Sequence, residues 1–405
     1  MLRLFNSLGK KTEPFTPVNK NYVSLFTCGP SVYQKSHIGN FRTFLFEDIL
    51  ARYLEFSGYR VIRGLNFTDI EDKAIQEAER QKTTLGRITA KNIRIFLKEM
   101  DLLRMKTPEF LPRASECIHE AAGLIQILMD KQYAYRHRGN VYFDPLRFQG
   151  FGRVYGLDLS AWPAKKRRFH RDTYPGVQWN LGDFILWHGY KKGDRYFWDT
   201  QIGRGRPGWN VQDAAIVSKY FDETLSLYCG GFDNLFRHHD YTLAILESVR
   251  PYSMARFWLH CNHLFVNGEK MSKSRQNIIY IDSLRQSGYS MSEIRFFLLY
   301  GHYSERLYYS DRAMGSAAER LRAFRAAVRK IRGIPSSGSS PDKIISRRIK
   351  KIFTEHMDND LRVQDAFDGL YGIIMSRAGT GMNAGEASEI MRTLREIDEV
   401  LQVIF

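Results

Sequence analysis

Residues 22–48 read YVSLFTCGPSVYQKSHIGNFRTFLFED, and this stretch decides the fold. Its first part, residues 22–27, is a β-branched and aromatic run that stops at a Cys-Gly-Pro turn, which predicts a strand. Apolar residues then recur at helical spacing over 41–57 until Gly58, and residues 59–66 predict the next strand. This order opens a parallel α/β fold, in which ligands bind at the carboxyl ends of the strands.

The turn before the predicted helix contains Ser36-His37-Ile38-Gly39-Asn40, whose last four residues we call the HIGN motif. A glycine lets the backbone approach a ligand closely, and a helix start offers free N–H groups and a positive dipole to phosphate. His37 and Asn40 also have side-chain donors for phosphate oxygens. The motif predicts a phosphate site, although a match of four residues recurs by chance.

A second motif, Lys270-Met271-Ser272-Lys273-Ser274, follows much later, and we call it the KMSKS motif. Two lysines three residues apart on a loop of small residues can neutralise the charge that builds on an α-phosphate as pyrophosphate leaves. An exposed basic loop is the alternative interpretation. Found together, the two motifs resemble the signature of the catalytic domain of class I aminoacyl-tRNA synthetases.

Within that class the chain resembles the cysteinyl-tRNA synthetase family from residue 1 to about residue 403. The resemblance implies a ligase that uses ATP and Mg²⁺ to form an aminoacyl-adenylate and then passes the aminoacyl group to tRNA. The stretches that carry it are residues 22–48, NFTDIEDK (66–73), DFILW (183–187), GRGRPGW (203–209), WLHCNHLFVNGEKMSKSRQNI (258–278) and LLYGHYSERLYYS (298–310).

The resemblance also implies a role for each matched position. The residues expected to bind ATP are His37, Gly39, Asn40, Gly230, Gly231, Asp233, Lys270 and Lys273. Of these, His37, Asn40, Lys270 and Lys273 would act in catalysis, with the two lysines stabilising the transition state. The residues expected in the amino-acid pocket are Cys28, Thr68, Trp209, Asp213, His238 and Thr242.

The chain departs from the family at its zinc site. The family holds zinc with two cysteines, a histidine and a glutamate, and the zinc binds the thiolate of the cysteine substrate. The four matching positions here are Cys28, Asp213, His238 and Thr242. Two ligands are replaced, and threonine rarely binds zinc, so we expect little bound zinc. A zinc site with three ligands, Cys28, Asp213 and His238, is the alternative.

The patterns and the resemblance together predict an α/β fold, a class I synthetase Rossmann-type sheet with an insertion, followed by a helical bundle. The family continues beyond its bundle into an anticodon-reading domain, whereas this sequence ends with the bundle, as does a related ligase of the mycothiol pathway. The expected segments are the first half of the catalytic domain (1–120), an inserted connective unit (121–204), the second half (205–265), the KMSKS loop with stem-contact helices (266–334), and the bundle (342–405), after a linker (335–341).

The 405-residue chain carries a formal net charge of +16, which points to an anionic partner. Four scattered cysteines without a CxxC pair are typical of reduced, cytoplasmic thiols, and no apolar run is long enough to span a membrane.

Four arginines are predicted to share one face of a helix and to contact RNA: Arg322, Arg325, Arg329 and Arg332. Basic residues of the insertion could contact RNA with them: Lys165, Lys166, Arg167 and Arg168. The alternative is an ordinary helix face exposed to solvent.

Three functions therefore stay open at the level of sequence. The first is a divergent ligase that activates cysteine or another amino acid and transfers it to tRNA or to a small-molecule amine. The second is an orthodox cysteinyl-tRNA synthetase with an altered metal site, and the third is a non-catalytic RNA-binding or regulatory paralogue. The sequence identifies neither the amino acid, nor the acceptor, nor the oligomeric state.

Overall fold

The computed structural model describes residues 1–157, 183–271, 275–334, 343–378 and 381–405. Its centre is a four-stranded parallel sheet in the order β10-β9-β3-β4. The central strand β3 pairs with β4 at Thr27–Leu65 and with β9 at Thr27–Cys229. The predicted parallel α/β fold is confirmed. The strands are β3 (Val23–Thr27), β4 (Val61–Leu65), β9 (Leu225–Gly231) and β10 (Ala255–Cys261).

Helix α1 (Ile38–Phe56) connects β3 to β4 and begins at Ile38, earlier than the apolar pattern from residue 41 predicted. The reason is a capping box: the His37 side chain accepts from the Asn40 backbone N–H, and the Asn40 side chain accepts from the His37 backbone N–H. The first turn reads Ile-Gly-Asn, in which a single apolar residue sets no period, so the pattern missed it. The cap places the HIGN motif directly at the carboxyl end of the sheet.

Side chains of the central strands alternate between two hydrophobic cores. Leu25 and Leu227 lie in a core shared with α1 and the C-terminal helices, whereas Phe26 and Tyr228 lie in a core on the other face. Both faces of the sheet are therefore covered, as parallel sheets require. The helices of the second core are α4 (Ile118–Asp130), α5 (Trp209–Tyr220) and α6 (Asp240–Val249).

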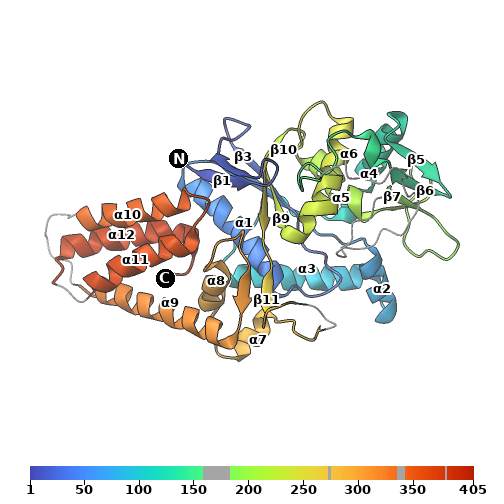
Figure 1. Cartoon of the computed structure of the whole chain (residues 1–405). Helices are drawn as coiled ribbons and strands as arrows, with labels where there is room; N and C mark the ends of the chain where they lie inside the picture. Colours follow the sequence, from blue (N-terminus) through green and yellow to red (C-terminus); the bar gives the residue numbers. More distant parts are fainter. Residues whose placement is uncertain (158–182, 272–274, 335–342, 379–380) are drawn as a thin grey trace.

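The predicted β-rich insertion contains an antiparallel sheet in the order β5-β6-β7-β8. Figure 1 shows it at the opposite end of the molecule from the C-terminal helices. The basic stretch Lys165–Arg168 lies outside the described residues, and the segment boundaries given above stay a prediction. The strands are β5 (Ala134–His137), β6 (Asn140–Phe143), β7 (Phe184–Gly189) and β8 (Gly205–Pro207).

The C-terminal helices pack against one another and against α1. The predicted bundle at 342–405 contains α10, α11 and α12. The linker predicted at 335–341 lies outside the described residues. The helices are α8 (Met291–Leu299), α9 (Asp311–Arg332), α10 (Ile344–Met357), α11 (Val363–Arg377) and α12 (Ala384–Leu401).

One buried arginine links α1 to these helices. The Arg295 guanidinium on α8 lies 2.7 Å from the Asp48 carboxylate on α1, and both side chains are almost fully buried. Arg295 also donates to the backbone carbonyls of Leu401 and Leu103. A single side chain thus links α8 and the ends of two further helices to α1.

The remaining strands and helices are short elements at the edges of these units and the helices that connect them. The N-terminal hairpin consists of β1 and β2, and a small three-stranded sheet in the order β12-β11-β13 carries the start of the KMSKS motif. The bounds are β1 (Arg3–Asn6), β2 (Lys11–Pro14), α2 (Asp72–Arg80), α3 (Leu85–Leu102), β11 (Leu264–Val266), β12 (Glu269–Lys270), α7 (Ile281–Gln286) and β13 (Leu307–Tyr309).

Candidate active site

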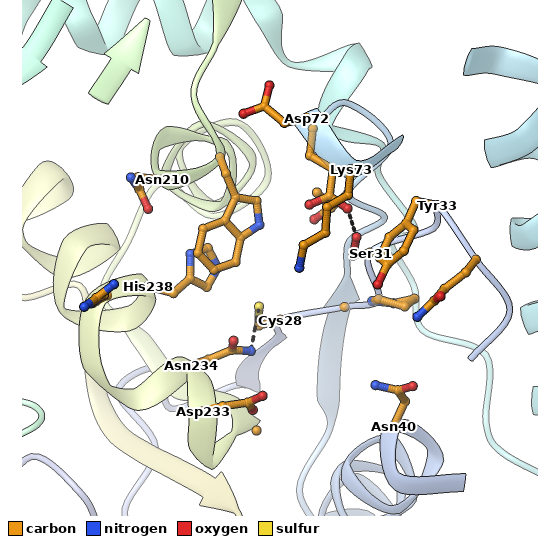
Figure 2. A pocket seen from close by; sticks show the side chains of 18 of the residues that line it. Cys28, Ser31, Tyr33, Asn40, Asp72, Lys73, Asn210, Asp233, Asn234 and His238 are labelled. Carbon is orange, nitrogen blue, oxygen red and sulfur yellow. Dashed lines mark hydrogen bonds between the residues drawn. The ribbon is translucent and has the colours of Figure 1, made fainter. Parts of the chain in front are cut away.

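A cavity of about 390 Å³ opens at the carboxyl end of the central sheet. The predicted site residues that line it are Cys28, His37, Asn40, Thr68, Trp209, Gly231, Asp233 and His238. They come from the ends of β3, β4 and β9 and from the starts of α1 and α5. Figure 2 shows Cys28 in the middle of this cavity, with Asn40 and His238 on different sides of it. The structure thus brings two groups of predicted residues to one cavity.

The phosphate side of the cavity is built on the HIGN motif. His37 Nδ1 accepts from the Asn40 backbone N–H at 3.3 Å, so the ring hydrogen of neutral His37 belongs on Nε2. Burial lowers the pKa of His37 to about 4, so the ring is neutral near pH 7. Within the described residues, His37 Nε2 and Asn40 Nδ2 are therefore the side-chain donors left for phosphate oxygens.

Backbone N–H groups on either side of Gly39 already have acceptors at this helix start. The His37 N–H donates to Asn40 Oδ1, the Ile38 N–H to the Ile279 carbonyl, and the Asn40 N–H to the His37 carbonyl. These amides are already used by the cap and by the segment after the KMSKS motif. Within the described residues, the Gly39 N–H, the side chains and the helix dipole remain to attract phosphate.

The glycine of the HIGN motif allows the two nucleotide motifs to meet. A Cβ added at Gly39 would lie 2.6 Å from Met271 Cε and 3.1 Å from the His37 ring. Met271 is buried, and Lys270 lies next to it with Nζ 3.5 Å from Asp233 Oδ2 and 3.4 Å from His263 Nε2. Lys273 lies outside the described residues, so its role stays a prediction.

The carboxyl end of β9 lies close to Cys28 and Asp233, which line the cavity. A Cβ at Gly230 would lie 2.7 Å from the His239 ring, and one at Gly231 would lie 2.8 Å from Asp233 Oδ1. Only glycine fits these two positions without displacing a neighbour. The backbone of the strand end is therefore kept close to Cys28 and Asp233, although the predicted nucleoside contact of these glycines stays a prediction.

The amino-acid side of the cavity is an aromatic and polar corner. The His238 ring stacks on Trp209 with centroids 3.8 Å apart and an interplanar angle of 17°. The Cys28 thiol accepts a hydrogen bond from Asn234 Nδ2 at 3.6 Å. Burial, reinforced by the Asp213 carboxylate, holds the pKa of the Cys28 thiol well above its usual value. The corner therefore contains a neutral thiol and a stacked imidazole.

Asp213, where the family has its second cysteine, is locked into a buried hydrogen-bond network. Its Oδ1 accepts from Asn66 Nδ2 at 2.9 Å, and its Oδ2 lies 2.8 Å from the Tyr228 hydroxyl and 3.0 Å from His238 Nε2. Burial raises the pKa of Asp213, but the interactions with His238 and Tyr228 outweigh burial and bring the pKa below its usual value. Asp213 is thus an ionised and internally satisfied carboxylate.

Thr242, where the family has glutamate, does not face the cavity. Its hydroxyl donates to the His238 carbonyl at 2.8 Å within the helix, and the side chain is fully buried. The four positions of the family's zinc site therefore do not offer four free ligands. Within the described residues, the donors that gather within 4.8 Å of one another are those of Cys28, His238 and His239. His239 Nδ1 is already 2.7 Å from His260 Nε2.

We expect the purified protein to contain well under one zinc per chain, because Asp213 and Thr242 are used inside the protein. Elemental analysis of protein purified without added zinc checks this. The double variant Asp213→Cys with Thr242→Glu should raise the zinc content if the backbone keeps its geometry. One tightly held zinc in the native protein would contradict the prediction and would indicate His239 as a replacement ligand.

Sequence reasoning missed several residues that line the cavity. Glu71, which accepts from the Ser31 hydroxyl, and Lys73 belong to the quoted stretch 66–73, so that stretch was the signal for them. Arg237 lies next to His238 with φ of 71° and 7% exposure, and nothing local in the sequence indicates that backbone conformation. The other missed lining residues include Tyr33, His188, Arg206 and Asn234.

The four arginines predicted to contact RNA differ in their surroundings. Arg322 lies 2.5 Å from Glu293, and Arg325 donates to the backbone carbonyls of Ile404 and Phe405. Arg329 and Arg332, by contrast, are exposed on the last turns of α9. Two of the four thus have intramolecular partners, and the RNA contact stays a prediction.

The comparisons with known proteins agree with this geometry. Residues 14–319 match the family model described as the tRNA synthetases class I (C) catalytic domain. A cysteine–tRNA ligase of Chlamydia pneumoniae is 33% identical, covering 100% of this chain and 86% of that protein, and one of Koribacter versatilis is 35% identical, covering 100% and 82%.

Solved structures show the same fold at low sequence identity. A methionyl-tRNA synthetase of Mycobacterium tuberculosis in complex with methionyl-adenylate has a TM-score of 0.63 at 14% identity, covering 95% of this chain and 90% of that chain. The complex LeuRS-tRNA-LeuAMS of Agrobacterium radiobacter K84 has a TM-score of 0.67 at 12% identity, covering 96% and 85%. The fold and the paired nucleotide motifs therefore define a ligase of the class I aminoacyl-tRNA synthetases.

Within that class, the chain belongs to the cysteinyl-tRNA synthetase family. Enzymes of this kind use ATP and Mg²⁺. Among the described residues, no helix combines the length and the apolar composition that crossing a bilayer needs.

Proposed function

We propose that this chain forms an aminoacyl-adenylate from ATP and an amino acid that it selects without zinc, and then transfers the aminoacyl group to an acceptor. The observation that carries the proposal is the Asp213 network: a carboxylate satisfied by Asn66, Tyr228 and His238 occupies the place of a metal ligand. Without zinc to bind a thiolate, cysteine loses the interaction that distinguishes it from other short side chains.

The chemistry at the phosphate side needs no metal held by the protein. Mg²⁺ would arrive with the triphosphate and be held mainly by phosphate oxygens. His37 Nε2 and Asn40 Nδ2 would donate to the phosphates, and Lys270, next to Asp233, would neutralise charge as pyrophosphate leaves. The amino-acid carboxylate would attack the α-phosphate from the side where Cys28, Trp209 and His238 lie.

The test is pyrophosphate exchange into ATP, measured with each protein amino acid in turn and without added zinc. The proposal expects exchange with at least one amino acid, and this exchange should persist when a zinc-selective chelator is added and Mg²⁺ is kept in excess. Exchange with no amino acid, together with RNA binding, would instead support a non-catalytic RNA-binding protein.

A second candidate function is an orthodox cysteine–tRNA ligase. It is favoured by the full-length similarity to proteins of that name and by the proximity of Cys28, His238 and His239. It expects exchange with cysteine alone, and loss of that exchange when zinc is removed.

For the acceptor we propose tRNA, held in part by the exposed end of α9. Changing both Arg329 and Arg332 to glutamine should weaken binding of tRNA several-fold and reduce its salt dependence, while pyrophosphate exchange stays unchanged. Filter binding at several salt concentrations measures this. Replacing Lys91 and Arg94 on α3 by glutamine removes the same charge elsewhere and serves as the control. Aminoacylation of a small amine without measurable tRNA binding would contradict the proposal.

A further inference from the structure

The partner of His238 fixes which of its ring nitrogens is a donor. His238 Nε2 lies 3.0 Å from Asp213 Oδ2. The same carboxylate oxygen accepts from the Tyr228 hydroxyl, and the other oxygen accepts from the Asn66 amide. Because this carboxylate acts as an acceptor on all sides, the imidazole tautomer that fits it has its ring hydrogen on Nε2. Nδ1 then carries a lone pair and is an acceptor.

That acceptor has no hydrogen-bond partner within the parts of the chain that the structure describes. His238 is only 2% exposed, yet it lines the cavity, where its ring is held against Trp209. Buried acceptors in folded proteins are nearly always paired, because an unpaired one loses the hydrogen bond that water gave it. A ligand that donates a hydrogen bond here would restore that bond.

We propose that the amino acid activated by this chain has a short side chain that donates a hydrogen bond to His238 Nδ1, from a hydroxyl or an amino group. This inference rests on the proposed function and narrows its substrate to a class. A site built around a substrate hydroxyl rejects the analogue that lacks it strongly, because the polar group of the protein is then left unpaired. A thiol is only a weak donor, so cysteine should be a poorer substrate than serine.

The test compares matched side chains in pyrophosphate exchange, with Mg²⁺ in excess and either a zinc-selective chelator or added zinc: serine and 2,3-diaminopropionate against alanine, 2-aminobutyrate and cysteine. Serine or 2,3-diaminopropionate should exceed alanine by on the order of 10²-fold. Exchange that favours alanine or 2-aminobutyrate would overturn this inference and leave the proposed function intact. Exchange with cysteine that requires zinc would overturn both. Exchange with no amino acid would overturn the proposed function itself.

Two variants test the role of Nδ1 directly. His238→Phe keeps a ring to stack on Trp209 but removes the acceptor, so the preference for serine over alanine should fall at least tenfold. Ser248→Ala is the control: it removes a buried hydroxyl at the far end of α6 that has no partner among the described residues, so the preference should persist. An unchanged preference in His238→Phe would overturn the inference.

If His238→Phe fails to fold, as thermal unfolding would reveal, Asp213→Asn provides the second measurement. Its amide nitrogen can donate to His238 Nε2 and so move the ring hydrogen to Nδ1. The preference for serine over alanine should then be lost. A retained preference in this variant would likewise overturn the inference.

Discussion

Replacing Lys270 with alanine is expected to slow aminoacyl-adenylate formation by about 10²- to 10³-fold. Its Nζ lies 3.5 Å from Asp233 Oδ2, beside the cavity, and its charge acts on His37. Negative charge grows on the phosphates as pyrophosphate departs, so a positioned ammonium stabilises the transition state more than bound ATP. The dissociation constant of ATP should therefore change much less than the rate.

Pyrophosphate exchange with the best amino acid, and ATP binding by calorimetry, measure the two quantities separately. Lys91→Ala on the exposed face of α3 is the control and should keep the native rate. Lys273→Ala is expected to act like Lys270→Ala. Equal losses in ATP affinity and in rate would show that the lysine only holds ground-state ATP.

Replacing Arg295 with methionine is expected to lower the free energy of unfolding by about 3–5 kcal/mol. The change leaves the Asp48 carboxylate buried without its closest cation, and it frees the carbonyls of Leu401 and Leu103. Burial raises the pKa of Asp48, but Arg295 and Arg52 outweigh burial and keep the pKa below its usual value. Without Arg295 that pKa should rise.

The sign of the pH dependence follows from that shift. In the native protein Asp48 contributes stability above the pKa of an unfolded aspartate, and this contribution is lost as the pH falls through its lowered folded pKa. In the variant Asp48 can protonate at a higher pH, so the destabilisation should be largest near pH 7 and should shrink in acid. Chemical denaturation of the native protein and the variant, at pH 7 and in acid, measures this difference in the free energy of unfolding. Arg80→Met breaks the exposed pair with Glu77 and should have no measurable effect. An equally harmless Arg295→Met would contradict the prediction.

Much of the site could be predicted from the sequence because its signals are local. The HIGN motif lies at a helix start whose capping box is itself encoded by His37 and Asn40. The parallel strands were predicted from short apolar runs bounded by turns. The replacement of zinc ligands at Asp213 and Thr242 was also visible, since it needs only residue identity. These features depend on neighbours in the chain.

Only the tertiary structure decided what the replaced residues do. Asp213 is satisfied by Asn66, Tyr228 and His238, which come from separate parts of the chain, and Thr242 turns back to its own helix. Of the arginines on one face of α9, Arg325 is taken up by the C-terminal carbonyls. The sequence by itself indicated the class of enzyme, because the two nucleotide motifs that carry the resemblance to class I synthetases are short local stretches. The pairing of buried polar groups needed the fold, because a hydrogen bond depends on distances between residues that are remote in sequence.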